Sequence, residues 1–153
     1  MVLVYRGRVW YQVGVIPAPI RKLLQARKTQ IIAFELLAAI MAVLMIHTVI
    51  GEKVAVRHFI DNQSARSCII KASSKSWDLN NLVGLLWYKC GRLLNRWWAH
   101  YVHSKDNVAD APSRGQFQLL KQINAQEVPL DFSVAVSDAE NWLSSPDAVA
   151  LCP

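Results

Sequence analysis

The stretch from Ile31 to Ile50, IIAFELLAAIMAVLMIHTVI, constrains the fold of this chain more than any other. A helix this apolar on every side is either buried inside a protein or inserted in a membrane. Its length and basic flank fit a transmembrane span. Glu35 argues against one, because a carboxylate costs about 2.5–3.5 kcal/mol near the bilayer centre. We therefore expect a buried crossover helix, with a single-pass membrane protein spanning residues 31–50 as the alternative.

The other segments alternate between strand and helix patterns, which predicts a soluble α/β domain. At 153 residues and 53% hydrophobic content, the chain can bury a core in one domain. The expected elements are a hairpin over 1–16 that turns at Gly7, strands over 54–60 and 96–102, and helices over 63–71, 78–95 and 117–124. Trp87 and Tyr88 are expected in the core, and residues 128–153 are expected to be a linker or tail.

The net charge of +6 is concentrated at the front of the chain. Residues 1–34 contain no acidic residue, and their basic residues are Arg6, Arg8, Arg21, Lys22, Arg27 and Lys28. From residue 116 onward, acidic residues outnumber basic ones. A basic front fits a polyanionic partner such as a nucleic acid. An ordinary solvated basic surface accounts for the charge equally well.

The cysteines indicate a reducing compartment. Cys68, Cys90 and Cys152 have no CxxC spacing and leave an odd thiol after any pairing. This also argues against a structural zinc site. The N-terminal residues do not show the pattern of a cleavable signal peptide. Together these features predict an intracellular location, cytoplasmic or nuclear.

Three carboxylates fall where an α/β domain places its ligands. Glu35 lies near the start of the apolar helix, Asp61 ends a predicted strand, and Asp110 follows the next strand and its polar loop. Because the carboxyl ends of strands form the ligand crevice of open α/β sheets, we expect the three to converge. Two plainer interpretations stay open. Asp61 would cap the following helix, and Asp106 and Asp110 would cap a surface turn.

A cluster of carboxylates implies cations. Carboxylates packed together raise one another's pKa unless positive charge neutralises them. The chemistry that such a cluster serves is two-metal phosphodiester hydrolysis, in which two Mg²⁺ ions about 3.5–4 Å apart activate water and stabilise the leaving oxygen. The expected cofactor is therefore Mg²⁺ (or Mn²⁺), with Glu35, Asp61 and Asp110 as metal ligands.

Three motifs in this order resemble the ribonuclease H domain of retroelement (retrotransposon) reverse transcriptases. They are Phe34-Glu35-Leu36-Leu37-Ala38, then Phe59-Ile60-Asp61-Asn62-Gln63-Ser64-Ala65, then VHSKDNVADAPSR from Val102 to Arg114. The resemblance covers residues 1–115 and leaves residues 116–153 as a C-terminal helix and tail. It implies a ribonuclease H-like mixed sheet flanked by helices, and hydrolysis of the RNA strand of an RNA–DNA hybrid.

The resemblance also implies roles for single residues. Glu35, Asp61 and Asp110 would be the catalytic acids, and Asn62 would shape the substrate side of Asp61. His103 would stand for the mobile histidine of related enzymes. The other substrate-binding residues would come from the last motif: Lys105, Asn107 and Arg114. In that motif Asp106 fits the loop rather than the metal site.

One departure from the family concerns its first strand, which is central in the sheet. In the family this strand carries an Asp that touches both metals, whereas no Asp or Glu precedes Glu35 here. The hairpin over residues 1–16 matches the family's second and third strands. Two half-sheets with unpaired edges are then expected, unless the edges rejoin or another segment fills the gap. We expect a fragment of a longer polyprotein with an upstream reverse transcriptase domain, or a decayed copy.

The sequence thus supports three functional hypotheses. The first is a ribonuclease H-like domain whose nuclease activity is impaired by the missing Asp. The second is a non-catalytic nucleic-acid-binding module of the same fold. The third is a single-pass membrane protein spanning residues 31–50. The rest of the chain argues against it, because its pattern is that of a soluble α/β domain.

Overall fold

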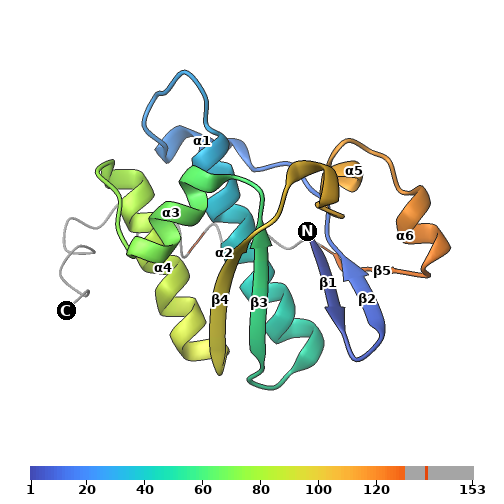
Figure 1. The fold of residues 1–153 in the computed structure, drawn as a ribbon. Helices are drawn as coiled ribbons and strands as arrows, with labels where there is room; N and C mark the ends of the chain where they lie inside the picture. The colour runs from blue at the N-terminus through green and yellow to red at the C-terminus, as the bar shows by residue number, and fades with distance from the viewer. Residues whose placement is uncertain (130–136, 138–153) are drawn as a thin grey trace.

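The structure, a computed structural model, describes residues 1–129 and Ser137. Within these residues the architecture is mixed α/β, with five strands in two separate sheets (Figure 1). Helices α2 (Ile31–Ile50), α3 (Gln63–Lys71) and α4 (Trp77–Leu93) pack together beside strands β3 (Ala55–Ile60) and β4 (Arg96–Tyr101). The fold class predicted from sequence is therefore confirmed at the level of α/β. The predicted tail falls almost entirely outside the described residues.

The first sheet is built on an N-terminal hairpin. Strand β1 (Val2–Tyr5) pairs antiparallel with β2 (Arg8–Tyr11), and β2 pairs parallel with β5 (Gln126–Glu127). Arg6 and Gly7 form the turn, with φ of +48° and +75°. A two-residue turn with both φ positive matches the twist of the strands that it joins. The predicted hairpin is thus present with a shorter second strand, while β5 was not predicted, because two residues carry no readable period.

The second sheet has two parallel strands, β3 (Ala55–Ile60) and β4 (Arg96–Tyr101). Both strands were predicted to within a residue or two. Among the described residues, no strand joins this sheet to the first one. Within this part of the chain the edges of β1 and β3 are not joined, and the strands form two separate sheets, β1-β2-β5 and β3-β4.

Helix α2 (Ile31–Ile50) forms the centre of the hydrophobic core. Leu36, Ile40 and Val43 are at most 1% exposed. The helix packs against α4 (Trp77–Leu93) and α3 (Gln63–Lys71). It ends at Gly51, whose φ of +72° lies in the left-handed region that glycine adopts without strain. The expected core helix is therefore present with the predicted bounds.

By length and composition, α2 is also a helix that could cross a membrane. Its mean hydropathy over the most apolar window is 2.2, and half of that window is buried inside the protein. No other helix of the described residues is long and apolar enough. Burial inside the core is a sufficient reason for its composition.

Trp87 and Tyr88 are more exposed than predicted. Their exposed fractions are 38% and 43%. Both lie beside, rather than on, the apolar stripe of α4, which consists of Leu79, Leu82, Val83, Leu86 and Cys90. The indole N–H of Trp87 donates to the carbonyl of Ile69 at 3.0 Å, so this ring closes the edge of the core. Placing both aromatic residues in the core was wrong.

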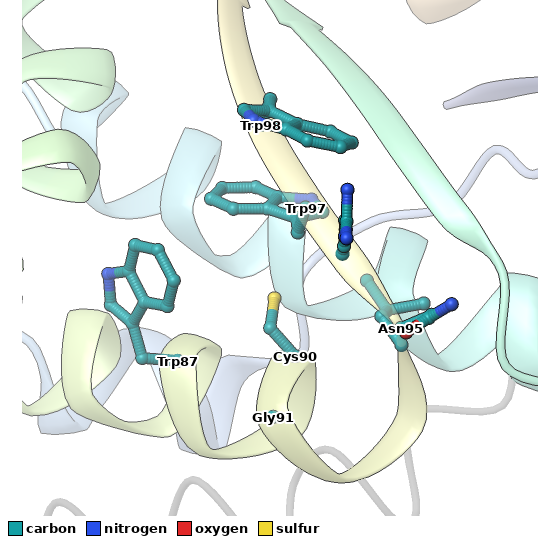
Figure 2. Close-up of a pocket in the computed structure, with 8 residues that line it drawn as sticks. Trp87, Cys90, Gly91, Asn95, Trp97 and Trp98 are labelled. Carbon is teal, nitrogen blue, oxygen red and sulfur yellow. The ribbon is translucent and has the colours of Figure 1, made fainter.

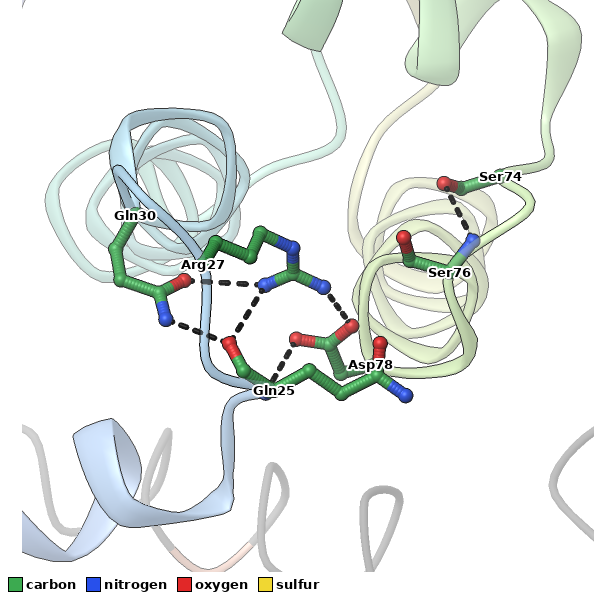
Figure 3. A network of polar contacts seen from close by, with 6 residues as sticks. All are labelled: Gln25, Arg27, Gln30, Ser74, Ser76 and Asp78. Atoms are coloured by element: carbon green, nitrogen blue, oxygen red, sulfur yellow. Dashed lines mark hydrogen bonds and ion pairs between the residues drawn. The ribbon is translucent and has the colours of Figure 1, made fainter.

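A buried ion pair ties the basic front to α4 (Figure 3). Asp78 is fully buried and pairs with Arg27, which follows helix α1 (Ala18–Leu23). The backbone N–H of Gln25 donates to the same carboxylate at 3.0 Å. Arg27 also donates to the side-chain oxygen of Gln30 at 3.0 Å. Arg27 therefore serves the fold, and it is not one of the basic residues available to a polyanion.

The Asp78 pair should be required for stability. Burial raises the pKa of Asp78, but the hydrogen bonds from Arg27 and Gln25 outweigh it, so the net pKa lies below the ordinary 3.8. We expect Asp78→Asn to lower the free energy of unfolding at pH 7 by about 3 kcal/mol, because it leaves a shielded guanidinium without its counter-charge. Urea denaturation with circular dichroism measures the change.

The same stabilisation should depend on pH. Since the native pKa is lowered, the contribution is complete above pH 3.8 and is lost as the pH falls through the native pKa. The control is Glu52→Gln, which breaks an exposed pair with Arg6 at 3.9 Å and should change little. Equal losses in the two variants, or a loss for Asp78→Asn that is undiminished at pH 2, would contradict this account.

Candidate acidic groove

A groove of about 660 Å³ runs between the two sheets, β1-β2-β5 and β3-β4. Strand β1 lines one side and strand β3 lines the other, and these two strands run in opposite directions (Figure 1). Helix α2 contributes Glu35, Ala38 and Ala42, which recur at helical spacing and so share one face. The two small side chains leave the groove open along the helix. We call this feature the acidic groove, because its end near Asp61 carries carboxylates.

Glu35 is the carboxylate most affected by this environment. Burial raises the pKa of its carboxyl group, and the negative charge of Asp61 raises it further, while the Met1 ammonium opposes the rise. The charge of Asp61 therefore reaches the carboxyl group of Glu35. The rise in the pKa of Glu35 therefore comes first from burial and second from the neighbouring carboxylate.

Asp61 follows β3 and lines the groove, half-buried. It does not cap the next helix. Asn62 is the N-cap of α3, and its side-chain oxygen accepts a hydrogen bond from the backbone N–H of Ala65 at 2.9 Å. The helix-cap interpretation of Asp61 was therefore wrong. The side chain of Asn62 is already engaged, so its predicted role at the substrate would be added to a structural one.

Asp110 begins the short helix α5 (Asp110–Ser113) and also lines the groove. Its carboxylate forms an ion pair with Arg114 one turn later, at 3.0 Å. Asp110 thus combines the two interpretations drawn from sequence, because it belongs to a local turn and faces the groove. The ion pair places Arg114, a predicted substrate-binding residue that is 69% exposed, beside the predicted acid.

The remaining predicted residues lie in the loop before α5. Asp106 and Asn107 line the groove, and Asn107 accepts a hydrogen bond from the backbone N–H of Ala109 at 3.1 Å. His103 and Lys105 are exposed and lie at the 3-10 turn of residues 104–106, outside the residues that line the groove. The structure therefore lines one groove with four acids, among them Asp106, which was predicted to belong to the loop only. His103 and Lys105 lie at the surface outside the groove lining.

His58 is a groove residue that the sequence analysis missed. It lies on β3, and its ring packs edge-on against Trp97 with ring centres 5.6 Å apart. Burial, aided by the charge of the Met1 ammonium, lowers the pKa of His58 to about 4. The ring is therefore neutral at pH 7 and adds no positive charge to the groove. On β3, His58 alternates with Val56 and Ile60, so all three side chains lie on the helix-facing side of the strand. This alternation in the sequence could have identified His58 as an inward-facing residue.

The carboxylates do not form a complete metal centre as they stand. Among residues 1–129 and Ser137, no three His, Cys, Asp or Glu side chains are placed to hold a metal ion. Glu35 and Asp61 have the oxygen chemistry that Mg²⁺ prefers, while Asp110 is held by Arg114. The assignment of all three as metal ligands remains a prediction.

A second hollow of about 490 Å³ lies where α4 meets β4 (Figure 2). Its walls include Trp87, Cys90, Trp97 and Trp98. Burial raises the pKa of Cys90 to about 12, so the thiol stays protonated at neutral pH and is a poor nucleophile. No acid or base lines this hollow besides Arg96 and Cys90. The acidic groove is therefore the stronger candidate for a site.

No protein-family model, curated protein or solved structure matches this chain. The assignment of a function depends on its own residues and their arrangement.

The coupling between Glu35 and Asp61 can be tested directly. We expect Asp61→Asn to lower the pKa of Glu35, because it removes the neighbouring charge and leaves only burial. Carboxyl-selective NMR titration of Glu35 measures it. The control is Glu127→Gln on β5, which bonds Tyr11 and not the groove. A Glu35 pKa that is the same in the wild type and Asp61→Asn would show that the two carboxylates do not interact.

Proposed function

We propose that this chain is a ribonuclease H-like domain of retroelement type, directed at RNA–DNA hybrids and impaired in hydrolysis as it stands. The observation that carries the proposal is the position of Glu35, Asp61 and Asp110. They come from three separate elements, in the order of the three motifs, and line one groove. Fold-level resemblance alone would not support a function.

The strand order supports the same proposal. The order β5-β2-β1 on one side of the groove and β3-β4 on the other leaves one gap, between β1 and β3. This is where the family's first strand would stand. Its Asp would then enter at the end of the groove that holds Glu35 and Asp61. There, burial and then the charge of Asp61 raise the pKa of Glu35.

The donor set does not fit two metal ions without a further carboxylate. Phosphodiester hydrolysis by this mechanism needs both ions, one to activate water and one to stabilise the leaving oxygen. The described residues supply a coupled pair, Glu35 and Asp61, and a third acid that Arg114 holds. The residues of this chain therefore support binding and positioning of a hybrid better than its cleavage.

Non-catalytic nucleic-acid binding is accordingly the second candidate. Arg8, Arg21, Lys22 and Lys28 are exposed and form no ion pair among the described residues. Such residues bind phosphates without regard to sequence. The affinity falls as the salt concentration rises, because the release of counterions from the nucleic acid then contributes less free energy. The third hypothesis, a membrane span at residues 31–50, has the length and composition of α2 in its favour, but half of the most apolar window of this helix is already buried inside the protein.

Cleavage assays separate the first two candidates. We expect the 153-residue chain to cleave an RNA–DNA hybrid negligibly, since losing even one preorganised donor costs about 10²–10³-fold and a ligand shared by two metals should cost more. Adding an upstream strand that bears an Asp should restore Mg²⁺-dependent cleavage. Asp61→Asn in the extended protein should abolish it, whereas Glu127→Gln on β5, outside the groove, should retain most of it.

Two outcomes would count against the proposal. Robust cleavage by the unextended chain, lost in Asp61→Asn, would show that no strand is missing from the catalytic site. An extended protein that binds the hybrid in a salt-sensitive manner, yet never cleaves it, would favour the non-catalytic module.

A further inference from the structure

The side of the β3-β4 sheet that faces away from the helices is exposed and carries aromatic and basic side chains. Successive side chains of a strand point to opposite faces, so every second residue of β3 and β4 points away from the core. Figure 1 is seen from this side, with β3 and β4 in front of α2. We call this surface the outer face. It consists of six exposed residues: Ala55, Arg57 and Phe59 of β3, and Arg96, Trp98 and His100 of β4.

The register of the two strands gathers the rings of the outer face into one patch. Phe59 lies opposite His100, and their ring centres are 5.6 Å apart with planes inclined by 34°. Arg57 lies opposite Trp98, two residues away along each strand, a distance of about 6.6 Å. Phe59 is 57% exposed and Trp98 is 46% exposed. Both rings can therefore be covered by a flat ligand without any movement of the core.

The positive charge of the outer face has no counter-charge. Neither β3 nor β4 contains an Asp or a Glu. Arg57 and Arg96 form no hydrogen bond and no ion pair among the described residues. They differ in this from Arg27, which Asp78 holds, and from Arg114, which pairs with Asp110. Two guanidinium groups beside exposed rings are thus available to an anionic partner.

The composition of the outer face favours a nucleic acid over a protein as this partner. The centre of a protein–protein interface is apolar and depleted of charge. Here the only aliphatic side chain is that of Ala55, and guanidinium groups lie among the rings. Proteins that bind single-stranded nucleic acid combine positive charge for the phosphates with aromatic rings on which bases stack. A duplex hides the faces of its bases, so only an unpaired strand can use the rings.

We propose that the outer face binds a single strand of nucleic acid. Bases stack on Trp98 and on the Phe59–His100 pair, while Arg57 and Arg96 contact the phosphates. No hydroxyl, amide or carboxylate side chain is present among the six residues, so the face reads no base edges and binding is independent of sequence. None of these residues is one of the predicted acids, and the proposal does not rest on the proposed nuclease function.

The test measures binding of the full chain to two labelled oligonucleotides of about eight nucleotides. One is a thymidine strand, and the other has the same phosphates but abasic sites throughout. We expect the thymidine strand to bind at least about tenfold more tightly by fluorescence anisotropy, because only its bases can stack. NMR should place shifts at the indole N–H of Trp98 and at the amides of β3 and β4. A chelator is present, so a failure of metal-dependent hydrolysis does not affect the result.

A matched pair of tryptophan variants locates the site. Trp98→Ala should weaken binding of the thymidine strand at least about tenfold and leave binding of the abasic strand unchanged. Trp77→Ala removes a ring that is similarly exposed, at 41%, from the start of α4, and should change neither affinity. Circular dichroism establishes that both variants fold. If Trp98→Ala does not fold, Phe59→Ala takes its place in the same comparison.

A third variant separates phosphate contacts from stacking. Arg57→Gln should weaken binding of both strands and lower the slope of log affinity against log salt by about one.

Four results would overturn the proposal. They are equal affinity for the thymidine and abasic strands, equal losses in the two tryptophan variants, shifts confined to residues 1–34, and no binding of either strand. Self-association of the chain that Trp98→Ala abolishes, without binding of either oligonucleotide, would assign the outer face to a second copy of the protein instead.

Discussion

Burial of helix α2 is the interaction on which the rest of the structure depends. The two sheets share no strand within the described residues, so their relative placement depends on packing rather than on a hydrogen-bonded ladder. Leu3 of the first sheet and Val56 of the second both pack against the cluster that α2 dominates. At about 25 cal/mol for each Å² of apolar surface removed from water, a helix buried on this scale can hold elements that are not otherwise joined.

The same helix places the chemistry. Glu35 is carried by α2, which lines the groove together with β1 and β3, and the groove also receives Asp61 at the end of β3. An acid on a core helix is shielded from water, and this shielding raises its pKa and makes it sensitive to neighbouring charge. The groove therefore combines a gap between two strands with an end that carries several carboxylates. The proposed recognition of a hybrid draws on this combination.

Much of the fold could be predicted from the sequence, because long periodic segments carry strong signals. The apolar run of α2, ended by Gly51, gave correct bounds, and the alternation of β3 and β4 located both strands. Trp87 and Tyr88 were misplaced because hydrophobicity does not reveal which side of a helix faces the core edge. The Arg27–Asp78 pair and the shielded His58 depend on contacts between distant segments, which no local pattern encodes. Similarly, Asn62 rather than Asp61 caps α3 for reasons of backbone geometry.

The central claim is that β1 and β3 belong to two separate sheets and that their facing edges are open. Native-state hydrogen exchange tests this claim most directly. The amides of Leu3 and Tyr5 are bonded to β2, and that of His58 is bonded to β4, so they should exchange slowly. The amides of Val2, Val4, Arg57 and Phe59 should exchange rapidly, because they point into the groove. Alternating protection along β1 and β3 is the predicted result. Slow exchange at Val4 and Phe59, equal to that of Leu3 and His58, would show that the edges are paired and would contradict this account.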